Sequence, residues 1–103
     1  MIVRKNNALK RKVWDGLLTT DLFNHMVSVT DEDGDNIEEP SGVLDFFDYL
    51  RDNVSYYRVL ELAKTWSDLS EIEQVSTASE MVNDFHLSRF MMMMDYVSTK
   101  ADA

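Results

Sequence analysis

Apolar residues recur at helical spacing along most of this chain, and few residues in the sequence interrupt that spacing. The 103 residues include one proline, Pro40, and three glycines, the last of which is Gly42. The first clear apolar stripe has members at i, i+3, i+4 and i+7, namely Val43, Phe46, Phe47 and Leu50. A stripe of this kind is what a helix needs to pack against a core. We therefore predict a helix that begins at an N-cap, Ser41, and ends at Asn53.

The same period continues toward the C-terminus. Ser55 is a candidate cap for a second helix, whose apolar face holds Tyr56, Val59, Leu60 and Ala63. A third helical region covers residues 71–98, which contain no glycine or proline, and it starts at a cap, Ser67 or Ser70. This region is either one long helix or two helices broken near residues 76–79.

The N-terminal third is less regular. Residues 8–18 suggest an amphipathic helix with a basic outer face, and Asp21 is a candidate cap for a short element after it. Residues 26–38 begin with alternating apolar and polar residues and then reach Asp33-Gly34, a common turn dipeptide. This stretch is either a short β-hairpin or an irregular acidic loop.

These segments predict a mainly α-helical protein, a small single-domain bundle of four to five helices over residues 1–103. Residues 1–12 would be its basic N-terminal segment, and residues 26–38 would hold the short hairpin if one forms. The expected core is drawn from all the helices: Trp14, Leu17, Phe23, Phe46, Phe47, Leu50, Val59, Leu60, Trp66, Val75, Val82, Phe85 and Phe90.

The charge of the chain excludes several classes of partner. The chain has nineteen acidic residues and ten basic ones, which gives a formal net charge of −9. Five of the basic residues lie in the first twelve positions. Direct binding to nucleic acid or to an anionic membrane is therefore disfavoured, and a partner with a basic surface is favoured. No apolar run is long enough for a membrane span, and there is no cysteine. We predict a cytoplasmic protein.

No catalytic, cofactor or metal motif stands out. The three glycines form no phosphate-binding loop, and the two histidines, His25 and His86, are far apart. Residues 31–37 share acidic positions with an EF-hand, but Gly34 falls at position 4 and Gly42 at position 12, where glutamate is needed. We therefore expect no enzymatic activity, no cofactor and no metal site.

Acidic residues are densest between positions 31 and 52, which hold nine acids and one base. A ribbon of carboxylates can imitate the phosphates of DNA and block a nucleic-acid-binding site, although acidic surfaces also serve solubility alone. The candidate partner-binding residues are Asp31, Glu32, Asp33, Asp35, Glu38, Glu39, Asp45, Asp48, Tyr49 and Asp52. This small, acidic, cysteine-free profile resembles that of inhibitors encoded by phages or mobile elements. The resemblance implies an inhibitory binding protein and identifies no residue.

A second feature is a run of five apolar residues, Phe90, Met91, Met92, Met93 and Met94. Methionine is unbranched and polarisable, so it adapts to irregular surfaces. Such a run fills a core, or it forms the interface of a homo-oligomer or a groove for a partner helix. The alternative function is therefore a helical oligomerisation or adaptor module that uses this segment.

Overall fold

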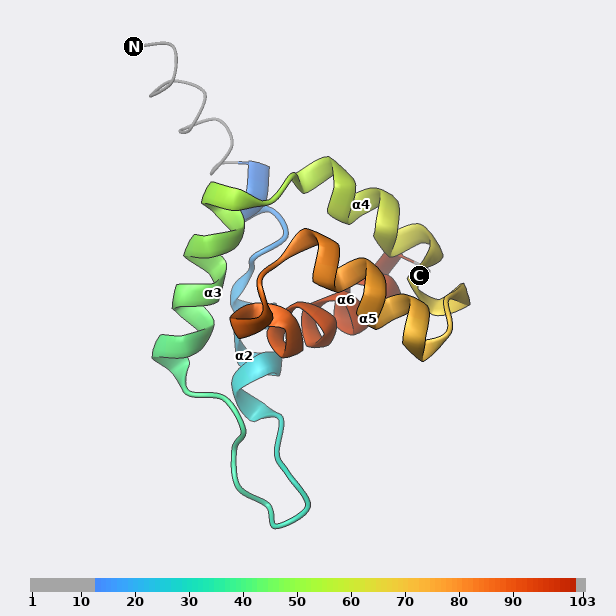
Figure 1. Ribbon diagram of the computed structural model, residues 1–103. Helices are drawn as coiled ribbons and strands as arrows, with labels where there is room; N and C mark the ends of the chain where they lie inside the picture. The colour runs from blue at the N-terminus through green and yellow to red at the C-terminus, as the bar shows by residue number, and fades with distance from the viewer. Residues whose placement is uncertain (1–12, 102–103) are drawn as a thin grey trace, which may run out of the picture. The chain divides into compact units, whose positions relative to one another are not determined.

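The computed structural model of the chain describes residues 13–101, and these are mainly helical (Figure 1). In chain order the elements are α2 (Thr20–Ser28), α3 (Pro40–Asn53), α4 (Tyr56–Thr65), the 3₁₀ helix η1 (Trp66–Asp68), α5 (Glu71–Met81), the 3₁₀ helix η2 (Asp84–His86) and α6 (Leu87–Ala101). The helical class is confirmed, but the predicted number of four to five helices is not. The basic segment 1–12 lies outside the described residues, and of the predicted helix over 8–18 only residues 13–15 are described as helical.

Contacts divide the chain into two compact units, one that ends at Tyr56 and one that begins at Tyr57. In the first unit, α2 and α3 contact each other. Trp14, which precedes both helices in the sequence, is fully buried. The indole N–H of Trp14 donates a hydrogen bond to the carbonyl of Val54 at 3.3 Å, and its ring meets Tyr56 edge-on. A residue upstream of both helices is thus fixed to the end of α3.

Helices α2 and α3 begin at residues other than those expected. The hydroxyl of Thr19, and not Asp21, accepts the capping hydrogen bond of α2 from the backbone of Leu22. Pro40 occupies the first turn of α3, so Ser41 lies inside the helix and is not its cap. Proline suits this place because its missing N–H would have no partner in the helix.

The hairpin at residues 26–38 is not confirmed. Met26 to Ser28 is the last turn of α2, and Thr30 and Asn36 form one isolated antiparallel bridge. The described residues contain no β-strand. Residues 29–39 are instead an irregular loop, the alternative that the sequence had left open.

In the second unit, the predicted region 71–98 is two helices, broken at Val82 and Asn83 and not near residues 76–79. Ser70 begins α5 with a capping box, because its hydroxyl accepts from the backbone of Glu73 and the Glu73 carboxylate accepts from the backbone of Ser70. The Asn83 side chain caps η2 by accepting from the backbone of His86. Helix α6 contacts α5, η1 and η2.

The core agrees with the prediction at most positions. The buried members are Trp14, Phe46, Phe47, Leu50, Val59, Trp66, Val82 and Phe90, and the partly buried ones are Leu17, Phe23 and Leu60. Val75 and Phe85 were predicted wrongly, since 38% and 74% of their surface is exposed. The error at Phe85 follows from the break after α5, which ends the helical register. Val75 lies before that break, and its exposure shows that α5 turns another face inward, at Ala78.

Candidate functional site

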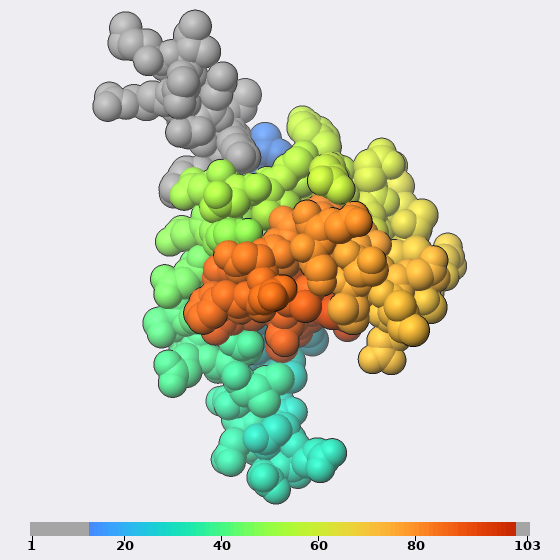
Figure 2. Space-filling model, in the orientation of Figure 1, coloured from blue at the N-terminus to red at the C-terminus, as the bar shows by residue number. Residues whose placement is uncertain are grey.

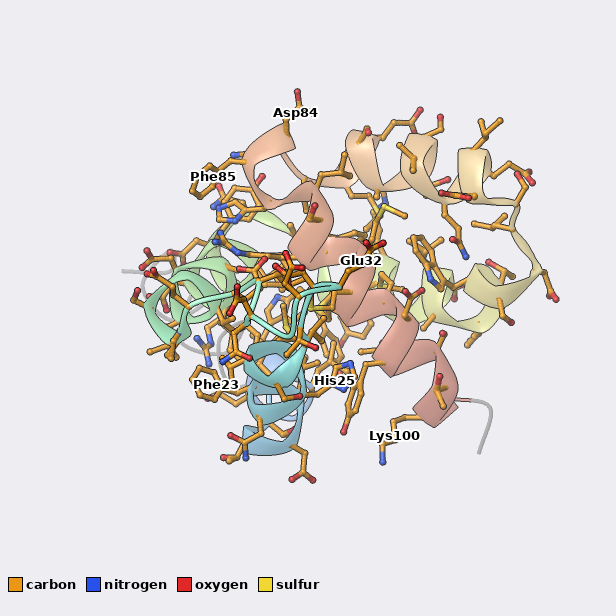
Figure 3. The ribbon with its side chains drawn as sticks, turned by 90° about the horizontal axis from the view of Figure 1, so that it is seen from below. Phe23, His25, Glu32, Asp84, Phe85 and Lys100 are labelled. Atoms are coloured by element: carbon orange, nitrogen blue, oxygen red, sulfur yellow. The ribbon has the colours of Figure 1, made fainter. Side chains whose placement is uncertain are left out.

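The acidic residues of the loop between α2 and α3 lie on the surface. Five of its six carboxylate side chains are exposed, and Glu38 is half-buried. Figure 2 shows this loop as a projection that extends past the atoms of α3. Figure 3 labels one of its acids, Glu32. The loop therefore presents negative charge to solvent without a base in its own sequence.

One acid of this loop has a structural role. The carboxylate of Asp31 accepts hydrogen bonds from the backbone N–H groups of Asp33 and Asp35, at 2.9 and 3.0 Å. The backbone N–H of Gly34 donates to the Asp31 carbonyl, and the φ angle of Gly34 is 88°, a conformation that favours glycine. Asp31 therefore stabilises the turn that carries the neighbouring acids.

A row of three carboxylates follows along α3. Asp45, Asp48 and Asp52 are exposed, whereas Phe46 and Leu50 are fully buried. At about 100° per residue, this spacing places the three acids on the side of the helix away from the core. The side chain of Tyr49, the predicted aromatic anchor, is half-buried.

An ion-pair network lies beside this row. Both the Nε and an Nη of Arg51 donate to one carboxylate oxygen of Asp15, at 3.1 and 2.8 Å, and the other Nη donates to Asp48 at 3.3 Å. Arg51 is the only base among residues 13–56. It reduces the charge in the middle of the row, so the loop carries the denser negative field. No pattern in the sequence indicated the contact between Asp15 and Arg51, because the two residues are separated by 36 positions.

The spacing of the charges can be compared with DNA. The α3 row rises about 5 Å along the helix per carboxylate, whereas one strand of B-DNA carries a phosphate about every 3.4 Å along its axis. The helix alone is thus sparser than a single strand. The loop and the row together, nine acids between positions 31 and 52, are needed to approach such a field.

The first unit also has an apolar groove that the sequence did not predict. It has a volume of about 270 Å³. Its lining comes from α3, from α2 and from the residues just before α2: Leu18, Thr19, Thr20, Phe23, Leu44, Phe47 and Arg51. The rings of Phe23 and Phe47 meet edge-on with centroids 6.4 Å apart. Leu44 is 53% exposed, so an apolar side chain of this groove faces solvent.

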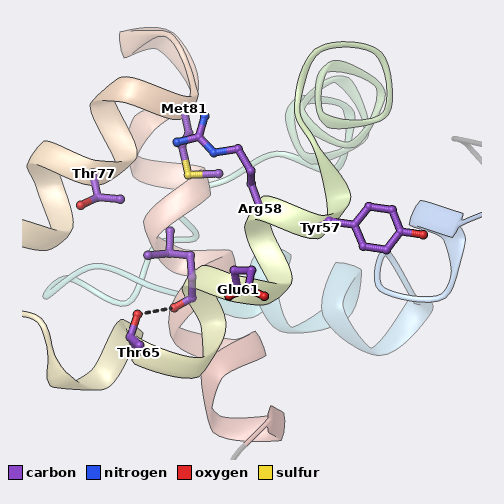
Figure 4. A pocket seen from close by; sticks show the side chains of 7 residues that line it. Tyr57, Arg58, Glu61, Thr65, Thr77 and Met81 are labelled. Atoms are coloured by element: carbon purple, nitrogen blue, oxygen red, sulfur yellow. Dashed lines mark hydrogen bonds between the residues drawn. The ribbon is translucent and has the colours of Figure 1, made fainter.

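A second groove lies between α4 and α5, in the second unit (Figure 4). It has a volume of about 460 Å³ and is lined by Tyr57, Arg58, Glu61, Leu62, Thr65, Thr77 and Met81. The Tyr57 ring points away from Thr77 and Met81 in this view, and the hydroxyl of Thr65 donates to the carbonyl of its own helix at Leu62. The polar groups therefore do not converge on a point where a reacting atom would sit.

The methionine-rich segment lies in α6. Phe90, Met93 and Met94 are completely buried within the chain, while Met91 and Met92 are partly exposed. Phe90, Met93 and Met94 therefore fill the core. An oligomer interface at this segment stays a prediction. The most exposed apolar residues among those described in the second unit are elsewhere, at Ile72 on α5 and at Phe85 on η2, beside Asp84 in Figure 3.

Within residues 13–101, few side chains have a shifted pKa or could serve as metal ligands. Hydrogen bonds from Ser70 hold the pKa of the exposed Glu73 carboxylate below its usual value, which is a capping effect. In the described part of the chain, no three histidine or carboxylate side chains come together as metal ligands. Among its helices none is both long and apolar enough to cross a lipid bilayer.

No protein-family model matches this chain, and no curated protein or solved structure is detectably similar to it. Its function therefore has to be inferred from its own residues.

Proposed function

We propose that this chain is a non-enzymatic binding protein whose first unit occupies a basic site on a partner protein. The partner site is of the kind that normally binds nucleic acid, so occupation by this chain blocks it. The acids of the 31–39 loop and the α3 row supply the field. A cytoplasmic location suits this proposal, because the cysteine-free chain has no need of an oxidising compartment.

The observation that carries the proposal is the concentration of unbalanced charge. Residues 13–56 contain eleven acids against one base, and that base is held by Asp15 and Asp48. Like charges held this close repel one another and reduce stability, which a surface evolved for solubility alone can avoid by mixing signs. A surface of this kind attracts basic partners and speeds their encounter.

The test is recovery of partners from a host extract by tagged full-length protein, followed by mass spectrometry. We expect a nucleic-acid-binding protein that is retained at low salt and released by high salt or by competing duplex DNA. A variant that neutralises exposed loop acids should lose it: Glu32→Gln, Asp33→Asn and Glu39→Gln.

The matched control removes the same charge from exposed acids of the second unit: Asp68→Asn, Glu80→Gln and Asp84→Asn. This control should retain the partner. Retention that resists salt and DNA, or that both variants weaken equally, would contradict a site on the first unit.

A further inference from the structure

We propose that the groove between α2 and α3 anchors an apolar side chain carried by a lysine- or arginine-rich segment of the partner. This inference rests on the proposed function, and it adds the source of affinity that the acidic surface does not supply. It also specifies the partner's recognition segment: basic residues that flank one protruding apolar residue.

The groove has the size and lining for one side chain. Its volume of about 270 Å³ lies below the range of about 300–1,000 Å³ that is usual for pockets that enclose small ligands. Phe23, Phe47 and Leu44 give it apolar walls, and Leu44 is more than half exposed. These walls come from two helices in contact with each other, so they are positioned before a partner arrives.

The charges around the groove favour a basic segment. Arg51 lies in the lining, but its guanidinium already contacts the carboxylates of Asp15 and Asp48. Asp45, adjacent to Leu44 on α3, adds a further exposed carboxylate. Next to the groove, the three carboxylates of Asp15, Asp45 and Asp48 therefore outnumber the one base, Arg51.

The two kinds of contact have different roles in binding. Exposed charges steer association and set its salt dependence, but each contributes little to affinity. Apolar side chains that fill a pocket near the centre of an interface usually account for most of the affinity. The groove next to the α3 row provides such a pocket.

The experiment follows backbone and methyl NMR signals of the full-length protein during titration with two synthetic peptides. One is a lysine-rich helical peptide with a single central leucine, and the other is the same peptide with serine in that place. We expect both to shift signals of the 31–39 loop, and only the leucine peptide to shift Leu18, Phe23, Leu44 and Phe47. The leucine peptide should also bind about tenfold more tightly.

Each outcome decides a separate question. Equal affinities, with shifts confined to the acidic residues, would overturn the groove as an anchor and leave the acidic binding surface standing. Absence of any shift with either peptide at low salt would overturn the proposed function as well. Shifts in the α4–α5 groove in place of the α2–α3 groove would refute the assignment of the anchor.

Substitutions in the protein itself also test whether the groove anchors the leucine. Leu44→Ser should remove most of the preference for the leucine peptide, and Leu44→Met, which keeps an apolar side chain of similar size, should restore it. Ile72→Ser is the matched control, because Ile72 is an exposed apolar residue on a helix of the second unit. It should leave both affinities unchanged, and an equal effect of Ile72→Ser and Leu44→Ser would contradict the inference.

Discussion

The two compact units build their cores in a similar way and differ in surface charge. Each has one tryptophan that is almost completely buried and whose indole N–H donates a hydrogen bond, from Trp14 to the Val54 carbonyl and from Trp66 to the Asp95 carboxylate. Residues 13–56 hold eleven acids and one base, whereas residues 57–101 hold seven acids and four bases. The excess negative charge of the described chain is therefore concentrated in residues 13–56.

The bases of the second unit show how an ordinary acidic surface is balanced. The Nζ of Lys64 lies 3.9 Å from a carboxylate oxygen of Glu61, one helical turn away. The cation of Arg89 lies over the ring of Phe85, and that of Lys100 lies over the ring of Tyr96. Residues 13–56 have one base, Arg51. The difference shows that two similar cores can carry surfaces of different charge. We therefore expect substitutions of surface charges to leave the packing of the core intact.

The largest effects are expected from truncation of matched core phenylalanines, one in each unit. Phe46→Ala on α3 and Phe90→Ala on α6 should each lower the free energy of unfolding by about 3–5 kcal/mol, because both side chains are fully buried. Phe85→Ala is the control, since Phe85 is 74% exposed and its loss, with that of its contact with the Arg89 cation, should change stability by about 1 kcal/mol or less. Urea unfolding followed by circular dichroism measures all three. A large loss in Phe85→Ala would show that this residue is core after all.

Replacement of each tryptophan by phenylalanine tests whether the units unfold together. Trp14→Phe and Trp66→Phe should each cost about 1–3 kcal/mol, because each removes an indole hydrogen bond from a part-buried or buried acceptor. Each variant also leaves one tryptophan, so its fluorescence reports on one unit. For each variant we expect the fluorescence and circular-dichroism unfolding curves to coincide, since a chain of about 60 residues or fewer buries so small a share of its surface that it is only marginally stable alone. Two separate transitions would contradict the prediction of a single domain.

A smaller effect distinguishes the helix caps of the two units. Ser70→Ala should cost about 1–2 kcal/mol and Thr19→Ala about 0.5–1 kcal/mol, because Ser70 takes part in a two-way capping box and Thr19 accepts one hydrogen bond. Thermal unfolding near neutral pH measures the difference. Equal losses would contradict the additional role of the box.

The capping box also carries a pH dependence, which Glu73→Gln tests, because the backbone N–H of residue 70 is the main cause of the lowered Glu73 pKa and remains in Ser70→Ala. Folding lowers the pKa of Glu73, so its contribution is complete above the pKa of the unfolded chain and disappears as pH falls through the folded-state pKa. The difference in stability between the native protein and Glu73→Gln, whose side chain carries no charge at any pH, should therefore narrow on acidification. A difference that stays constant down to low pH would show that the carboxylate adds nothing to the cap.

Helical periodicity was sufficient to predict α3 and the buried faces of α3 and α4, because each stripe lies within one uninterrupted helix. It failed at Phe85, because a helix break at Val82 and Asn83 needs neither glycine nor proline. The start of α2 was misplaced because Thr19 and Asp21 are both good caps, and the backbone geometry decides between them.

The candidate site was predictable only in part. Local density of acids identified the loop and the α3 row, since those residues are close in sequence. The α2–α3 groove and the contact of Asp15 with Arg51 join segments that are distant in sequence, and no spacing rule relates them. Contacts of that kind depend on how two helices pack and require the folded structure.

A small change in stability is expected from Arg51→Gln, and it sharpens the comparison of the two surfaces. The side chains of Asp15 and Asp48 are 61% and 63% exposed, so these ion pairs are screened and their loss should cost about 1 kcal/mol or less. The substitution removes the only base of residues 13–56, and it should speed association with the lysine-rich peptide at low salt. Lys64→Gln makes the same change in net charge on the second unit, where it should leave that association rate unchanged. Stopped-flow measurements at two salt concentrations decide between them: equal acceleration by both variants would mean that total charge attracts the peptide, and that the first unit has no special part in it.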